Sequence, residues 1–306
     1  MFNLRFPLVI IASFLAQFAF AQQAGKPRAQ VQIIPFELNK ANNIAIKAIL
    51  NHKDSIILMF HTAANELTLT EEAINRIKSL KFEGADTVKS WGGADNISRF
   101  SKRNNLQIGN TKRSNIPIWE NKNSGPQTDG KFGLELFADK IIEIDFDKSL
   151  IILHSELPSK VKTYEKLQLT FKDEMMFLTA NSEINGNQIP NTYLIHSGYA
   201  GTILFDDKFT ADNKIDGFLK VTDEKSLKDS FGNVLKTKKA ILPSFQIGSQ
   251  QLSNIPVGFF TGSLGRQKLS IIGCDILKRF NIIINADRTL IYLKANHFRN
   301  LTYTKS

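Results

Sequence analysis

Two histidines lie in similar short segments, and imidazole is the side chain whose ordinary pKa best suits acid–base or metal chemistry near neutral pH. One segment reads His61-Thr62-Ala63 after the apolar Phe60, and the other reads His196-Ser197-Gly198 after the apolar Ile195. Each histidine is followed by a hydroxyl residue and then by a small residue. If the fold brings the segments together, the two imidazoles form a symmetric pair with a shared role. The alternative is that both rings only fill space.

The other histidines do not complete a metal site in the sequence. His52 stands in a polar turn, and His154 and His297 follow two predicted hairpins, so we expect all three at the surface. A zinc site on His61 and His196 needs a third or fourth ligand. No HxxxH, HxxE or CxxC spacing supplies one. The sequence therefore predicts no metal and no cofactor.

The elements that must position the pair are repeated within the chain. Residues 131–153 (KFGLELFADKIIEIDFDKSLIIL) align without a gap with residues 271–293 (IIGCDILKRFNIIINADRTLIYL). Upstream, a Gln-Ile-Gly and Ser-Asn-Ile-Pro pattern at 107–117 recurs at 246–256. We expect a tandem duplication, with one lobe over 31–157, a second over 165–296 and a linker between them.

Short runs rich in β-branched and aromatic residues, bounded by Gly, Asn, Asp and Pro, predict a mainly β protein. The runs include 31–38, 141–146, 241–247 and 281–292. Helical patterns are brief: 70–80 begins with a threonine that can act as an N-cap, and 134–140 and 275–280 each suit one or two turns.

The order of these parts resembles the retropepsin-like and pepsin-like aspartic proteases, especially the bacterial aspartyl-protease domains. The resemblance is carried by the elbows that contain His61 and His196, by hairpins with Trp91 and Phe231, and by the closing elements that end at Gly133 and Gly273. It covers nearly all of the chain after the first segment. It implies a bilobal fold of two β-barrel-like lobes with short helices and a cleft between them.

The departure from that family lies at its chemistry. The family places one aspartate in each elbow, and the two share a proton because close carboxylates cannot both ionise. Here His61 and His196 stand at those positions, and Ala63 replaces the glycine of the first elbow. Lys131 also stands where the family prefers an apolar residue. Thr62 and Ser197 keep the hydroxyls that, in the family, lock the two elbows together by hydrogen bonds.

The resemblance therefore implies an aspartic-protease-like protein without the catalytic aspartates. We expect its cleft to bind an extended peptide or protein segment by strand pairing. The residues expected to line the cleft are Thr62, Ala63, Ser197, Gly198, Trp91 and Phe231. Two alternatives stay open: a hydrolase that uses the His61/His196 pair, with or without a metal, and an active aspartyl-type peptidase that uses other carboxylates.

The first residues predict export. Arg5 precedes an apolar run that ends in Ala19-Phe20-Ala21, which is typical of a signal peptide, 1–21, cleaved before Gln22. The run is too short for a spanning helix of about 20 residues. Cys274 is the one cysteine, so no internal disulfide is available, and we expect a periplasmic, cell-surface or secreted location.

The net charge of +10 comes from scattered Lys and Arg. A nucleic-acid surface would need a stripe of basic residues interleaved with aromatic residues, which this sequence lacks. The sequence therefore predicts no nucleic-acid partner.

Overall fold

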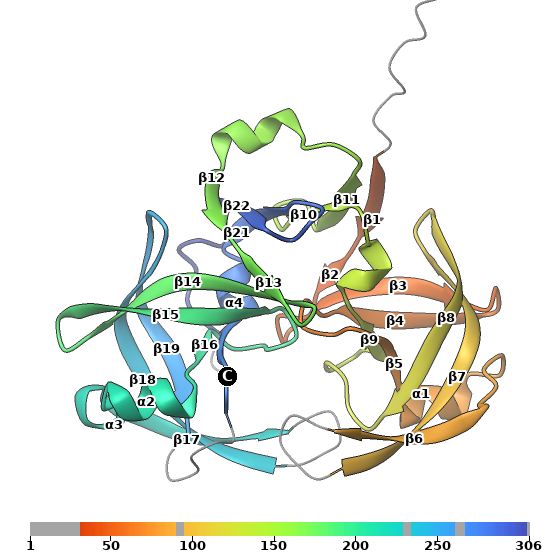
Figure 1. Cartoon of the computed structure of the whole chain (residues 1–306), viewed down its shortest axis with the longest axis horizontal. Helices are drawn as coiled ribbons and strands as arrows, with labels where there is room; N and C mark the ends of the chain where they lie inside the picture. The colour runs from red at the N-terminus through yellow and green to blue at the C-terminus, as the bar shows by residue number, and fades with distance from the viewer. Residues whose placement is uncertain (1–30, 90–94, 229–233, 261–266, 305–306) are drawn as a thin grey trace, which may run out of the picture.

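The computed structural model describes residues 31–89, 95–228, 234–260 and 267–304, and the structural statements below refer to these ranges. Within them the chain is mainly β, and no helix exceeds six residues. Figure 1 shows two lobes side by side, the first coloured red to yellow and the second green to blue, with a third sheet that bridges them. No helix in these ranges is long and apolar enough to cross a membrane.

The first lobe is an eight-stranded sheet in the order β2-β3-β4-β9-β5-β8-β7-β6. Its strands are β2 Glu37–Leu38, β3 Ile44–Leu50, β4 Asp54–Phe60, β5 Leu67–Thr70, β6 Gly84–Lys89, β7 Asp95–Ile108, β8 Thr111–Asn121 and β9 Gly130–Phe132. It carries the helix α1 Glu71–Arg76 and the 3-10 helix η1 Leu134–Phe137. As the sequence predicts, Thr70 caps α1, because its side chain accepts the N–H of Ala73.

The second lobe repeats this order as β13-β14-β15-β20-β16-β19-β18-β17. Its strands are β13 Thr170–Lys172, β14 Met175–Ile184, β15 Asn187–His196, β16 Ile203–Leu204, β17 Val221–Lys228, β18 Val234–Ile247, β19 Gln250–Phe259 and β20 Ser270–Gly273. Its helices are α2 Asp207–Asp212, α3 Ile215–Phe218 and α4 Cys274–Leu277.

The bridging sheet has six strands in the described ranges, in the order β1-β11-β10-β21-β22-β12. They are β1 Gln32–Pro35, β10 Ile141–Asp145, β11 Leu150–His154, β12 Glu165–Gln168, β21 Phe280–Ile284 and β22 Leu290–Ala295, and the 3-10 helix η2 Ser159–Thr163 precedes β12. β10 and β21 pair antiparallel at its centre, with Ile142 opposite Ile284. One sheet therefore contains closing strands from both halves of the sequence.

The repeated sequence segments occupy equivalent places in the two lobes. Gly109 lies in the β7–β8 turn at φ +55°, and Gly248 lies in the β18–β19 turn at φ +57°. Both have the left-handed backbone that favours glycine. Asn115 and Asn254 also share positive φ values, of 60° and 53°. The similar segments at 107–117 and 246–256 thus have the same backbone conformation at these positions.

Candidate functional site

The two elbows lie where one strand of each lobe ends. His61 directly follows β4, which runs parallel to β9, and His196 is the last residue of β15, which runs parallel to β20. Behind each elbow the chain passes very close to a glycine. A Cβ added at Gly133 would lie 1.6 Å from the carbonyl oxygen of Ala64, and one at Gly273 would lie 2.2 Å from that of Gly201. Only glycine fits these closing positions.

Thr62 and Ser197 lock the elbows together through four reciprocal hydrogen bonds. The backbone N–H of Thr62 donates to Ser197 Oγ (3.0 Å), and that of Ser197 donates to Thr62 Oγ1 (3.0 Å). The Thr62 hydroxyl donates to the carbonyl of Ile195 (2.7 Å), and the Ser197 hydroxyl donates to that of Phe60 (2.8 Å). Both side chains are about 1% exposed. The hydroxyls therefore point away from solvent and fix one elbow against the other.

This arrangement brings the two imidazoles into contact. The ring centroids of His61 and His196 lie 4.4 Å apart with an angle of 60° between the ring planes. His61 is 8% exposed, whereas His196 is only partly buried. Two residues 135 positions apart thus meet at the junction of the lobes.

Hydrogen bonding distinguishes the two rings. His61 Nδ1 accepts the N–H of Ala63 at 3.2 Å, so the proton of the neutral ring belongs on Nε2. His196 Nδ1 is buried and has no hydrogen-bond partner among the described residues. The pair therefore combines an N–H donor on one ring with an unsatisfied nitrogen on the other.

Both imidazoles are held neutral. Burial lowers the pKa of His61 well below its ordinary value, and the neighbouring His196 and the positive charge of Lys131 lower it further. Burial likewise lowers the pKa of His196 to about 4, again with a contribution from Lys131. No carboxylate of the described residues is among the groups that shift either pKa. Near pH 7 the pair carries no charge.

The glycine of the second elbow is required by the ring of the first. A Cβ at Gly198 would lie 2.1 Å from Cδ2 and 2.4 Å from Nε2 of His61. The imidazole of His61 therefore rests directly on the backbone of the other lobe.

Of the remaining residues expected at the site, Trp91 and Phe231 lie outside the described residues, and Ala63 contributes the backbone N–H already described. Within the described ranges, no group of three or more His, Cys, Asp or Glu side chains is placed to hold a metal ion. Cys274 is buried, as expected.

The expectation that His154 lies at the surface is wrong. Its side chain is only 11% exposed, and its Nε2 lies 2.8 Å from a carboxylate oxygen of the fully buried Glu143 on the neighbouring strand. This contact belongs to the bridging sheet and not to the elbows.

The two lobes differ on the sheet face beside the elbows. In the second lobe Leu204, Phe260 and Ile271 form a small apolar cluster against which Tyr199 packs. Strand pairing places Thr68 opposite Lys131 in the first lobe where the second has Leu204 opposite Ile271. Sequence reasoning noticed Lys131 but missed this polar face, which the repeat alignment of Lys131 with Ile271 could have revealed.

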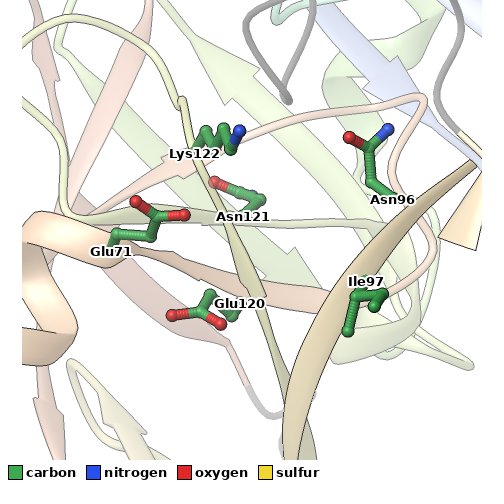
Figure 2. A pocket seen from close by; sticks show the side chains of 6 residues that line it. All are labelled: Glu71, Asn96, Ile97, Glu120, Asn121 and Lys122. Atoms are coloured by element: carbon green, nitrogen blue, oxygen red, sulfur yellow. The ribbon is translucent and has the colours of Figure 1, made fainter. Parts of the chain in front are cut away.

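A hollow of about 120 Å³ lies on the first lobe. Figure 2 shows its lining side chains, which come from α1, β7 and the end of β8: Glu71, Asn96, Ile97, Glu120, Asn121 and Lys122. Asn121 is 4% exposed, and its side-chain N–H donates to the hydroxyl of Thr68. The hollow is thereby joined through one hydrogen bond to the face that carries Lys131.

Comparison with known proteins identifies the fold. No protein-family model matches the chain, and no curated protein matches it. Among solved structures, the crystal structure of an aspartic proteinase from Irpex lacteus matches with a TM-score of 0.59 and 11% sequence identity. The match covers 90% of this chain and 100% of that one. The chain therefore has the bilobal, pepsin-like aspartic-proteinase fold, and at this identity the likeness concerns the fold alone.

Proposed function

We propose that this protein is an exported, catalytically degenerate member of the aspartic-protease fold that binds an extended peptide between its lobes. In this proposal His61 and His196 occupy the positions of the catalytic aspartates. The observation that carries it is the contact between two neutral imidazoles at locked elbows. Aspartic catalysis needs one carboxylate as base on a water and a protonated partner. Imidazoles with low pKa values supply neither the shared proton nor the negative charge.

The retained frame supports a binding role. The four reciprocal hydrogen bonds and the close-packed glycines keep the elbow geometry although the carboxylates are gone. An extended chain between two β lobes gains affinity from main-chain hydrogen bonds. In this proposal the lobes hold the peptide but lack the carboxylates needed to cleave it.

The test is a peptide-library assay on the mature protein from pH 3 to 7, with metal analysis of the same sample and binding measured in parallel. We expect peptide binding, no cleavage sensitive to transition-state analogues of the aspartic class, and weaker binding by His61→Ala. Inhibitor-sensitive cleavage in mild acid would contradict the proposal. Cleavage that is lost in His61→Ala, or that needs a bound metal, would favour a histidine-based hydrolase instead.

Export forms a separate part of the proposal. It is supported by the apolar run and the Ala19-Phe20-Ala21 pattern alone. Mass spectrometry of the protein from the native envelope fraction should find Gln22 at the N-terminus. An intact Met1 or a lipid-modified terminus would contradict it.

A further inference from the structure

The first-lobe hollow has an unusual feature, a buried amide oxygen with nothing to accept. Asn121 is 4% exposed, and its Oδ1 is buried without a hydrogen-bond partner among the described residues. Its Nδ2 is already engaged by the hydroxyl of Thr68, which fixes the amide so that the acceptor end stays unsatisfied. A buried acceptor without a partner is destabilising, so such a group points to a ligand that donates a hydrogen bond.

The other polar groups of the hollow have mixed character. Glu71 adds a carboxylate acceptor and Lys122 adds an ammonium donor, both from exposed side chains. The second carboxylate, that of Glu120, is held by the guanidinium of Arg99, whose Nε donates to it at 2.8 Å. The hollow therefore offers both acceptors and a donor, and its charges of opposite sign offset one another.

The second lobe has an apolar side chain at the position of Asn121. The strand pairings place Thr68 opposite Trp119 in β5–β8 and Leu204 opposite Gly258 in β16–β19. Trp119 and Gly258 are therefore equivalent positions. Asn121 lies two residues after Trp119, and its counterpart in the second lobe is Phe260, two residues after Gly258. Phe260 is 4% exposed and belongs to the cluster against which Tyr199 packs, whereas Ala64 stands at the position of Tyr199 in the first lobe. The two lobes thus offer different surfaces beside the same pair of elbows.

From these observations we propose that the first-lobe hollow is a subsite for a carboxamide side chain, that of glutamine or asparagine, in the bound peptide. This inference rests on the proposed peptide-binding function. A carboxamide donates through its NH₂ to Asn121 Oδ1 or Glu71 and accepts through its C=O from Lys122. An apolar side chain would leave the acceptor of Asn121 unpaired, and a carboxylate would set its own acceptor oxygens against it. Ile97, 79% exposed, offers apolar contact for the methylene stem at the rim.

The experiment uses the full mature chain and the peptides Ac-Ala-Ala-Xaa-Ala-Ala-Ala-NH₂ with Xaa as Gln, Glu or Leu, with dissociation constants measured by NMR titration. We expect the Gln peptide to bind about tenfold more tightly than the other two. Asn121→Phe, which copies Phe260, and the exposed Glu71→Ala should both remove the preference. Asn300→Phe, on the exposed C-terminal segment, is the control and should keep it.

The outcomes separate this inference from the function on which it rests. Equal binding of the three peptides, or a Gln preference that persists in both Asn121→Phe and Glu71→Ala, would overturn the subsite and leave peptide binding intact. Absence of binding by every peptide in this series and by the wider library would contradict the proposed function itself. If Asn121→Phe fails to fold by its thermal transition, Glu71→Ala alone decides, because the Glu71 side chain is exposed.

Discussion

The imidazole of His61 lies against the backbone of Gly198, two residues after the other histidine of the pair, so that a Cβ there would come within 2.1 Å of the ring. Gly198→Ala must therefore displace His61 or separate the elbows. We expect it to lower the free energy of unfolding by about 1–3 kcal/mol, as overpacking does. Urea denaturation measures the loss. In the control Gly217→Ala, in α3, the new methyl meets no atom within 4 Å and should stabilise by about 0.5–1 kcal/mol.

The hydroxyls of Thr62 and Ser197 should contribute jointly to stability. Thr62→Val removes the acceptor of the Ser197 N–H and the donor to the Ile195 carbonyl, both buried, at a cost of about 1–3 kcal/mol. Ser197→Ala should cost a similar amount, and a double-mutant cycle should give a non-additive result because the bonds are reciprocal. The exposed Thr179→Val should stay within about 0.5 kcal/mol of wild type. Additive losses would show that the two hydroxyls act independently.

Stability should fall in mild acid because of the histidine pair. The pKa of His196 is about 4 in the folded chain and about 6.5 when unfolded, so the unfolded state binds the proton first. The stabilisation is complete above pH 6.5 and is lost as pH falls from 6.5 towards 4, by about 3 kcal/mol for this ring. His196→Gln should flatten that part of the pH profile in chemical denaturation. An unchanged profile would mean that the ring titrates at its ordinary pKa.

The ring of Tyr199 should determine what the second lobe can bind. Burial raises the pKa of its hydroxyl to about 12, and its Cδ1 lies 2.5 Å from where a Cβ on Gly273 would be. Tyr199→Ala should lower the free energy of unfolding by about 3 kcal/mol and open a recess lined by the apolar cluster. Binding of the Leu peptide should then improve relative to wild type. The control Phe171→Ala removes an aromatic ring that is 43% exposed and should change neither quantity much.

The meeting of the two elbows could be predicted because the sequence contains two similar segments, one around each histidine. Each histidine follows an apolar strand and precedes a hydroxyl residue, and similar segments of the two lobes place the two histidines side by side. The structure bears out this geometry for His61 and His196 and for the hydroxyls of Thr62 and Ser197. What the pair does for the protein stays a prediction.

The repeat alignment points to Lys131, but the neighbours of Lys131 on the polar face, Thr68 and Asn121, were not predicted because their placement depends on strand register. Lys131 lies in the three-residue strand β9, which is too short for its alternation to show which side chain faces the core. Asn121 can be identified as a candidate site residue only from its hydrogen bond to Thr68 on a neighbouring strand and from its equivalence to Phe260 in the second lobe. His154 was misplaced for the same reason, because its partner Glu143 lies across a strand pair. Contacts across strands need a register that local patterns do not contain.

The bridging sheet also constrains the order in which the molecule can be built. Its central pair joins Ile142 to Ile284, so β10 has no partner on that edge until the chain has been synthesised almost to its end. Until then the first lobe presents an unpaired strand of buried residues, which is a template for association with other chains. A nascent or truncated form that stops before β21 should therefore depend on a chaperone, or on a second molecule that lends the missing strand.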